Sequence, residues 1–339
     1  MLATEIHEKI NQEISGKIIG KSAETRLLTI ALLAQGHAII EGVPGIAKTL
    51  LAKSFANILE LEFKRVQLTS DMLPSDITGT FVFNVKDQEF FFRKGPLFSN
   101  IVLADEINRG IPKTQSALLE AMQEDQVTVE GQTEKLSQPF MVIATQNPLE
   151  MRGTYPLPEA QLDRFMFRII MGLPNKAEEL EVLDRYEKDS ERDLEFNSIK
   201  TDLVEAREEI NTKITMSREI KEYIIAIMNA TRNESENISL GASPRASLHL
   251  MRACKVNAAL DGRDYVTPDD VKLLLFPTLN HRLIINPDFL LRNTKPSEVF
   301  NYSAIEEIIN KAVNSVNPCL LYTSPSPRDL STSRMPSSA

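Results

Sequence analysis

A glycine-rich stretch at residues 41–49, Glu-Gly-Val-Pro-Gly-Ile-Ala-Lys-Thr, limits what this chain can fold into more than any other feature. The apolar run 37–40 before it is typical of a buried strand, and residues 50–56 after it begin a helical pattern. The order strand, glycine-rich turn, Lys-Thr and helix is the layout of a phosphate-binding loop. The sequence therefore predicts an α/β fold with a nucleotide site at this turn.

The residue types in this loop suit the binding of a nucleoside triphosphate. Backbone N–H groups of a glycine-rich turn form a concave nest, and the following helix N-terminus adds positive partial charge. Lys48 would reach the β- and γ-phosphates of ATP, and the Thr49 hydroxyl would help to hold Mg²⁺. Ala47 stands where the motif has its second glycine, so a chance Lys-Thr after a turn is the alternative for this stretch alone. The predicted nucleotide-binding residues are Gly42, Val43, Pro44, Gly45, Ile46, Ala47, Lys48, Thr49 and Leu50.

An acidic pair supplies the second half of a nucleotide-hydrolysis signature. The apolar run 100–104 is typical of a strand, and it ends in Asp105 and Glu106. Asp105 would hold the water shell of Mg²⁺, as a Walker B aspartate does. Glu106 would polarise the attacking water. An acidic turn after a strand is common on its own, but together with Lys48 and Thr49 it favours a hydrolytic site.

Two further places are candidates for contact with the nucleotide. The buried-strand pattern at 140–145 ends in Gln146 and Asn147, and strand ends of a parallel sheet surround the ligand. These side chains would position water or the γ-phosphate, or they simply begin a loop. Ile19 and Gly20 belong to a short apolar connector between predicted helices at 3–15 and 23–34. That connector would pack against adenine, or it is a plain core turn.

Composition narrows the class of protein. The chain has 339 residues, enough for about two domains, with 42% hydrophobic and 25% charged residues. No apolar run approaches the ~20 residues that span a bilayer, and the N-terminus has no signal-peptide pattern. We expect a cytoplasmic protein without a membrane segment. The net charge of -9 argues against a general nucleic-acid binder, and neither the two cysteines nor the four histidines suggest a metal centre.

The pattern of elements changes near Pro174. Before it, aromatic runs at 81–83 and 90–92 predict one β-hairpin, and residues 127–136 with Gly131 in the turn predict a second. After it, strand signals vanish and helical stretches dominate, at 177–188, 217–232, 243–260 and 268–275. We therefore predict a nucleotide-binding domain at 1–173 and a helical domain at 174–318. The aromatic runs either project from the surface or belong to the core.

The last residues differ in kind from the rest. Residues 319–339 are crowded with Ser, Pro and Thr and show no periodicity. They resemble the translated read-through of a sequencing-library adapter, and a natural disordered tail is the alternative. On the first interpretation Cys254 is the only native cysteine, and we expect it to be a buried apolar group.

Several blocks together resemble the MoxR family of AAA+ ATPases, in the branch whose second helix carries an inserted β-hairpin. The matching blocks are 41–49 with Ala47 in the glycine position, 105–109, 113–122, 144–148 and 153–165. The resemblance implies an AAA+ fold: an αβα core with a phosphate-binding loop, a parallel sheet and β-hairpin inserts, followed by a smaller all-helical lid domain. MoxR-like sequences commonly carry alanine at the position of Ala47, so the departure from the motif supports the resemblance.

The resemblance also implies roles for single residues. Asn147 looks like the sensor-1 residue, Arg164 like an arginine finger supplied to a neighbouring subunit, and Arg245 like the sensor-2 arginine of the lid. A guanidinium at the γ-phosphate stabilises charge spread over its oxygens. A finger in trans requires a homo-oligomer, and the resemblance implies a hexameric ring. Arg109, beside Glu106, is a weaker candidate for a subunit contact.

The implied activity is hydrolysis of ATP with Mg²⁺, used to remodel or mature client proteins, some with a von Willebrand factor A domain. The hairpins would then project toward the pore or a client. Two other functions fit the sequence less well. A nucleotide-dependent binding switch would not need Glu106 and Arg164, and a DNA-remodelling motor fits poorly with the acidic composition.

Overall fold

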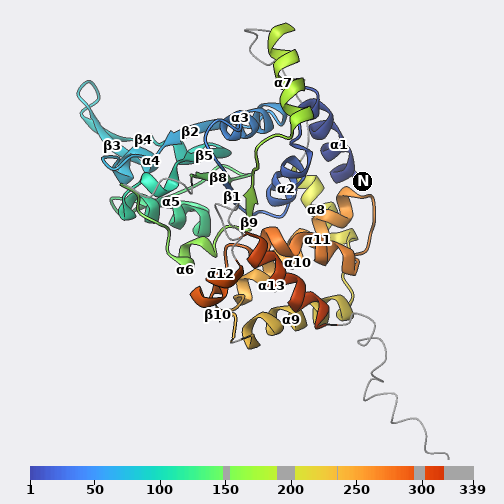
Figure 1. Ribbon diagram of the computed structural model, residues 1–339. Coiled ribbons are helices and arrows are strands. Elements are labelled where there is room, and N and C mark those ends of the chain that lie inside the picture. Colours follow the sequence, from blue (N-terminus) through green and yellow to red (C-terminus); the bar gives the residue numbers. More distant parts are fainter. Residues whose placement is uncertain (148–152, 189–202, 235, 294–301, 317–339) are drawn as a thin grey trace, which may run out of the picture.

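The computed structural model describes residues 1–147, 153–188, 203–234, 236–293 and 302–316. The stretch 319–339, interpreted above as a non-native tail, lies outside these residues, and so does Pro148 at the end of the block 144–148. Figure 1 shows a central sheet with helices around it, a long hairpin that projects from one side and a group of helices packed beneath the sheet.

A parallel sheet of five strands forms the centre of the described part of the chain. In spatial order the strands are β2 (Phe63–Gln67), β5 (Ile101–Asp105), β8 (Met141–Gln146), β1 (Ala38–Glu41) and β9 (Phe167–Ile170). Because the strands are parallel, their carboxyl ends lie along one edge of the sheet, which is where ligands bind in folds of this kind. The predicted phosphate loop follows β1 at this edge.

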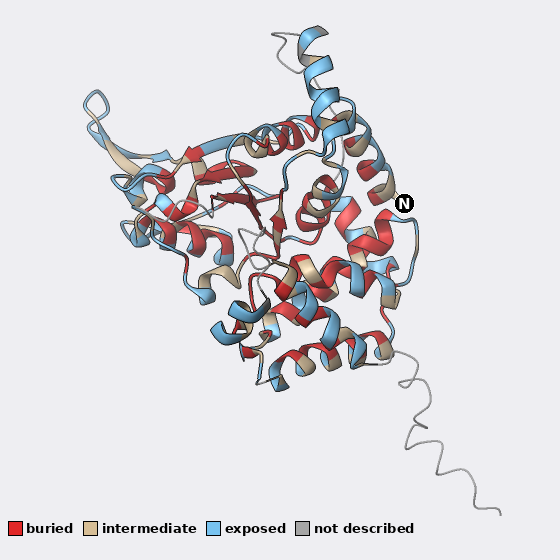
Figure 2. Cartoon of the chain, in the orientation of Figure 1, coloured by how far each residue is buried: buried red, intermediate tan, exposed pale blue. Residues whose placement is uncertain are grey.

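Alternation along the strands separates two hydrophobic clusters, one on each face of the sheet. Ile40 and Leu103 belong to the first cluster, while Ile39 and Val102 belong to the second. The second cluster includes buried residues of α5 (Pro112–Glu124). The first includes buried residues of α1 (Leu2–Ser15), α2 (Ser22–Leu33) and α3 (Lys48–Ile58). Figure 2 shows this buried material on both sides of the strands, which confirms the predicted αβα core.

The aromatic runs form the predicted hairpin. β3 (Gly79–Asn84) pairs antiparallel with β4 (Glu89–Lys94), and the pair projects from the body of the protein (Figure 1). Phe83, Phe90 and Phe91 are exposed, at 47%, 69% and 48%. Core packing, one of the two alternatives for these runs, is therefore wrong for these three rings. The hairpin rises from the short helix α4 (Pro74–Thr78).

The second predicted hairpin is also present. β6 (Gln126–Val129) pairs antiparallel with β7 (Gln132–Lys135) directly after α5. Gly131 occupies the turn with a φ of +81°, a conformation that glycine adopts without steric cost. Val127 is buried in the second cluster, so this hairpin lies against the body of the protein at its first strand.

The part of the chain after Pro174 is mainly helical, as predicted. Its helices are α7 (Lys176–Lys188), α8 (Leu203–Lys213), α9 (Arg218–Asn233), α10 (Pro244–Leu260), α11 (Pro268–Leu279), α12 (Pro287–Asn293) and α13 (Tyr302–Asn314). It is not all-helical, because β10 (Ile238–Leu240) pairs antiparallel with β11 (Ile284–Ile285). Strands this short show no alternation in the sequence, which is why the prediction lacked them. Among the described residues, none of the helices combines the length and the apolar character needed to cross a bilayer.

The first helix of the chain packs against the last part of it. The Thr4 hydroxyl donates a hydrogen bond of 2.8 Å to the carbonyl of Ala259 in α10, and the backbone N–H of Leu2 donates one of 2.9 Å to Glu209 in α8. The helix α1 therefore joins the sheet-bearing region to the helical region. The domain boundary near Pro174 stays a prediction.

The buried His281 gives the fold a pH dependence that can be measured. Burial, with the positive charges of Arg282 and Arg168, holds the pKa of His281 well below its ordinary value of 6.5. Below pH 6.5 the unfolded chain binds a proton at this histidine and the folded chain does not. The free energy of unfolding therefore falls by about 1.4 kcal/mol for each unit by which the pH is lowered. The variant His281→Gln cannot titrate and keeps an amide donor toward the carbonyl of Phe165. Urea unfolding between about pH 6 and pH 5 should give this variant the shallower slope, and equal slopes would contradict the assignment.

Candidate active site

The phosphate loop has the backbone expected for its motif. It connects β1, which ends at Glu41, to α3, which begins at Lys48. The Lys48 ammonium donates a hydrogen bond of 2.7 Å to the carbonyl of Gly42 and lies 3.5 Å from the carbonyl of Gln146. Lys48 thus lies over the turn, between the carboxyl ends of β1 and β8. This position suits a cation that meets phosphate oxygens.

Two positions in the loop explain its glycine pattern. A Cβ at Gly42 would lie 2.6 Å from the carbonyl oxygen of Met171, so any side chain there would force the loop away from the residue that follows β9. Ala47, where the motif has its second glycine, has a φ of +67° and ψ of 25°. This is the left-handed region, where alanine costs roughly 1–2 kcal/mol relative to glycine. The loop therefore keeps its conformation despite the substitution and carries strain at that point.

The predicted magnesium ligands lie side by side. Asp105 is the last residue of β5, and its carboxylate accepts a hydrogen bond of 3.4 Å from the Thr49 hydroxyl at the start of α3. The Thr145 hydroxyl of β8 donates to the other carboxylate oxygen. Two neighbouring ligands of an octahedral Mg²⁺, each at about 2.1 Å from the ion, lie roughly 3 Å apart. The oxygen atoms of Thr49 and Asp105 therefore fit the ion.

Arg65 was not predicted as a site residue. It lies on β2, the strand next to β5, and its Nε and Nη2 atoms donate to the same Asp105 oxygen at 2.9 and 2.6 Å. That oxygen also faces Thr49, so the guanidinium competes with any cation that approaches it. The only signal in the sequence is an arginine in an alternating strand, and the pairing of β2 with β5 is not visible there.

Glu106 and Asn147 lie at the same edge as the phosphate loop. Glu106 follows β5 with a φ of +54°, and its backbone N–H donates a hydrogen bond of 2.9 Å to the Thr145 hydroxyl. Its carboxylate forms an ion pair of 3.0 Å with Arg109. Asn147 follows the end of β8 and is 6% exposed. The structure therefore brings both residues to the strand ends around the loop, as predicted, with Glu106 held by Arg109.

A buried polar cluster around an ion pair connects the start of the loop to the helical region. Glu41, the last residue of β1, lies 3.3 Å from Arg168 of the neighbouring strand β9, and both side chains are largely buried. The Tyr302 hydroxyl at the start of α13 hydrogen-bonds to Glu41, and burial together with that carboxylate raises the Tyr302 pKa. Arg168 also donates a 3.0 Å hydrogen bond to the side chain of Asn280. Sequence reasoning missed this cluster, because its members come from distant segments.

Arg164 and Arg245 lie near the amino ends of the strands, at the edge of the sheet opposite the phosphate loop. They line one cavity of about 430 Å³ together with Gly36 and His37, which precede β1. The phosphate loop follows the other end of this four-residue strand, and four extended residues span about 13 Å. Within one chain, therefore, neither arginine sits at the phosphate loop. Arg245 was predicted to lie at a γ-phosphate. It lines the same cavity as Arg164, the candidate arginine finger.

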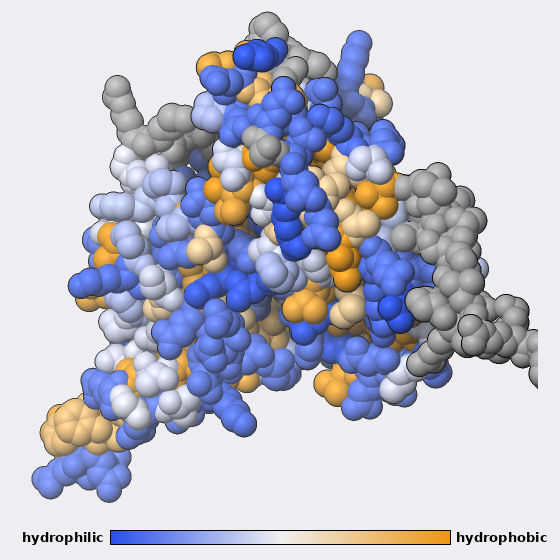
Figure 3. All heavy atoms as spheres, turned by 90° about the horizontal axis from the view of Figure 1, so that it is seen from below, coloured by the Kyte–Doolittle hydropathy of each residue, from blue (hydrophilic) through white to orange (hydrophobic). Residues whose placement is uncertain are grey.

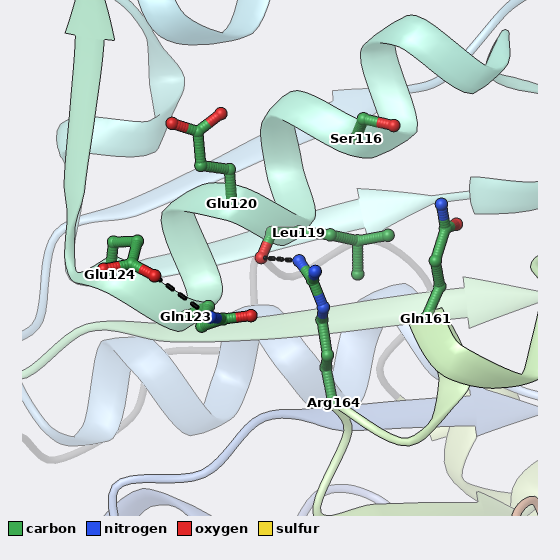
Figure 4. Close-up of a pocket in the computed structure, with 7 residues that line it drawn as sticks. All are labelled: Ser116, Leu119, Glu120, Gln123, Glu124, Gln161 and Arg164. Atoms are coloured by element: carbon green, nitrogen blue, oxygen red, sulfur yellow. Dashed lines mark hydrogen bonds between the residues drawn. The ribbon is translucent and has the colours of Figure 1, made fainter.

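Figure 4 shows Arg164 in an adjoining pocket of about 290 Å³. Its side chain points toward α5, and its Nη1 atom donates a hydrogen bond of 2.7 Å to the carbonyl of Leu119. Glu120 and Glu124 of the same helix line this pocket. The surroundings of Arg164 thus combine a cationic tip with acidic side chains at the protein surface.

The connector predicted to touch adenine lies beside the first turn of α7. Gly20 has a φ of +68°, and a Cβ there would lie 2.4 Å from the carboxylate of Glu178 in the first turn of α7. Ile19 is half-buried beside it. Contact of Ile19 and Gly20 with adenine stays a prediction.

The parallel sheet, the phosphate loop and the acidic strand end define a nucleotide-binding protein of the AAA class. Residues 37–167 match the family model of the "ATPase family associated with various cellular activities (AAA)", and residues 230–301 match the AAA lid domain. A crystal structure of a protein from Cytophaga hutchinsonii, described as a candidate ATPase, superimposes with a TM-score of 0.82. That protein is 41% identical, and the match covers 93% of this chain and 96% of the other.

Relatives narrow the class further. The chain is 48% identical over 281 residues to the uncharacterized protein YeaC of Bacillus subtilis, which covers 83% of this chain and 87% of YeaC. It is 38% identical over 325 residues to the chaperone MoxR1 of Mycobacterium tuberculosis, with 93% and 85% covered. It is also 30% identical over 315 residues to the protein MoxR of Methylorubrum extorquens, with 85% and 90% covered. The chain belongs to the MoxR family of AAA ATPases, and it is an enzyme that hydrolyses ATP.

Ala47 offers a test of the strained loop. The variant Ala47→Gly should raise the free energy of unfolding by about 1 kcal/mol, because glycine adopts a positive φ without a Cβ clash. The matched control is Ala52→Gly inside α3, which should lower the free energy of unfolding by about 1 kcal/mol. Urea unfolding of both variants measures the difference. A loss of stability at both positions would contradict a strained Ala47.

Proposed function

We propose that this MoxR-family ATPase works as a homo-oligomeric ring, a hexamer, in which each ATP lies between two subunits. The observation that carries the proposal is the placement of Arg164 and Arg245 at the sheet edge opposite the phosphate loop of their own chain. An arginine there serves a nucleotide only if that nucleotide belongs to a neighbouring subunit. Head-to-tail contacts that repeat in this way close into rings.

Each active site would combine groups from two chains. From one chain, Lys48 and the loop N–H groups bind the phosphates, Thr49 and Asp105 hold Mg²⁺, Glu106 takes the proton of the attacking water, and Asn147 orients that water. From the next chain, Arg164 and Arg245 stabilise charge on the γ-phosphate. Mg²⁺, when held by Thr49 and Asp105, would supply positive charge that offsets the negative charge of the phosphates. The ion pair between Glu106 and Arg109 involves the Oε2 atom of the carboxylate.

We propose further that ATP turnover remodels or matures client proteins, including partners with a von Willebrand factor A domain. Two facts support this part: a relative is named a chaperone, and the hairpin β3–β4 exposes three phenylalanine rings. Figure 3 shows a projection at the lower left that carries apolar residues beside hydrophilic ones. Exposed aromatic rings on a projecting hairpin suit contact with another protein. The net charge of -9 supports a protein client in place of nucleic acid.

The shared site predicts an ATPase activity that depends on assembly. Specific activity of the wild type should rise with protein concentration, because dilution separates Arg164 from the site it serves. Glu106→Gln should keep ATP affinity and lose turnover by about 100-fold or more, because amide nitrogen cannot accept the proton from water. Steady-state ATPase assays across protein concentration, with ATP binding measured alongside, check both statements.

Two controls separate the alternatives. Lys48→Ala should lose ATP binding, which Glu106→Gln keeps. Wild type that binds ATP tightly and turns over no faster than Glu106→Gln at any concentration would overturn the ring motor in favour of a binding switch. Salt-sensitive binding to DNA would point instead to a DNA-remodelling motor.

Arg65 predicts a competition with Mg²⁺. Arg65 is half-exposed and Asp105 is buried. At about 1 kcal/mol for the pair, Arg65→Met should tighten Mg²⁺ binding about fivefold. A Mg²⁺ titration of fluorescent ATP-analogue binding measures the change. The matched control is Lys64→Met, the next residue on β2, whose ammonium lies 3.9 Å from Glu62. Weaker Mg²⁺ binding in Arg65→Met would show that the guanidinium supports the ion.

A further inference from the structure

Arg282 joins the helical region to the segment that carries Arg164. It follows α11, and its side chain is 1% exposed. Its Nε donates 2.8 Å to the Asp163 carboxylate, and its Nη2 donates 3.0 Å to the Asp163 carbonyl and 2.5 Å to the Phe165 carbonyl. Its Nη1 donates to the carbonyls of Met166 and Thr278. The guanidinium therefore holds the backbone on both sides of Arg164.

The surroundings of Arg282 fit a charged guanidinium. Burial lowers its pKa to about 10, which leaves it charged at neutral pH, and the Asp163 carboxylate offsets its charge. His249 of α10 accepts a hydrogen bond of 2.7 Å from Arg282 through Nδ1. Burial and nearby arginines lower the His249 pKa to about 3, so this imidazole is neutral and free to accept. The donors of Arg282 are thus directed at fixed acceptors.

Asp163 connects the same segment to Arg245. Its carboxylate accepts 2.7 Å from the hydroxyl of Ser243, the N-cap of α10, and lies 3.6 Å from Arg245 in the first turn of that helix. One carboxylate therefore contacts Arg282, the cap of α10 and Arg245, and it immediately precedes Arg164 in the chain. The two arginines are set relative to each other through Asp163.

We propose that Asp163 and Arg282 are positioning residues that hold Arg164 and Arg245 as one rigid unit on the helical region. This inference rests on the proposed shared site. Movement of the helical region would carry both guanidinium groups together toward or away from the neighbouring subunit's γ-phosphate. Neither Asp163 nor Arg282 touches the nucleotide, and both lie away from the phosphate loop of their own chain.

Asp163→Asn is the sharpest variant, because it keeps the shape of the side chain and removes its charge. It should lower kcat by about 100-fold, the scale expected when catalytic groups shift by about 1 Å, while ATP affinity stays within about twofold. Arg282→Lys should lower kcat in the same direction, because lysine cannot reach the several acceptors of the guanidinium. A KM that rises with kcat unchanged would overturn the positioning role.

Mixing subunits separates positioning from general damage. Asp163→Asn subunits keep their own phosphate loop, and Lys48→Ala subunits keep their own arginines. In mixed rings an Asp163→Asn subunit can have a Lys48→Ala neighbour that supplies correctly placed arginines. ATPase activity of the mixture should therefore rise about tenfold or more above the sum of the separate proteins. The matched control is Asp270→Asn, which breaks another ion pair of the helical region, 2.6 Å long with Arg263, at the far end of α11. That variant should keep kcat.

A mixture of Arg164→Ala with Lys48→Ala distinguishes the possible failures. If this mixture recovers activity and the Asp163→Asn mixture does not, the positioning role is overturned and the shared site stands. If neither mixture recovers activity, the shared site fails, and the inference fails with it. If Asp270→Asn loses kcat as strongly as Asp163→Asn, the effect is general damage to the helical region and the positioning role is overturned.

Discussion

The buried strand β1 sets the distance between two functional surfaces of this chain, the phosphate loop and the cavity lined by Arg164 and Arg245. Its residues Ala38, Ile39 and Ile40 are fully buried, and it pairs in parallel with β8 on one side and β9 on the other. The phosphate loop begins directly at its carboxyl end, while Gly36 and His37 at its amino end line the arginine cavity. A one-residue register shift would turn every side chain of β1 to the wrong face of the sheet, so the register of β1 is fixed. The strand therefore keeps the two surfaces at a fixed separation.

Buried charges define how the helical region sits on the sheet. Glu41 pairs with Arg168 between the neighbouring strands β1 and β9, and Asp163 pairs with Arg282, which follows α11. Such pairs add little net stability, because desolvation offsets their attraction, but loss of one partner is costly. For Asp163 with Arg282 the value lies in specificity, since a slid or rotated helical region would leave these two charges unpaired. Glu41 immediately precedes the phosphate loop, and Tyr302 at the start of α13 hydrogen-bonds to it, so this helix docks close to the nucleotide site.

The sequence predicted features formed by residues close together in the chain, and it missed contacts between residues far apart in the chain. The phosphate loop, both hairpins and the acidic strand end are local patterns, and the structure contains each of them. Arg65 and Asp105 lie 40 positions apart, and Asp163 and Arg282 lie 119 apart, so their contacts depend on strand order and helix docking. No local pattern encodes either. The pair β10–β11 was missed for another reason: strands of three and two residues are too short to show alternation.

The separation of the two surfaces also bears on symmetry. If both arginines serve a neighbouring subunit, each chain has a donor edge, which carries Arg164 and Arg245, and an acceptor edge, which carries the phosphate loop. The two edges cannot meet within one chain. A two-fold dimer presents the same patch from both subunits, so it joins donor to acceptor only where the two edges form one patch. Here a strand of about 13 Å stands between them. In the proposed assembly, head-to-tail contact pairs every donor edge with an acceptor edge only when the chain of subunits closes into a ring.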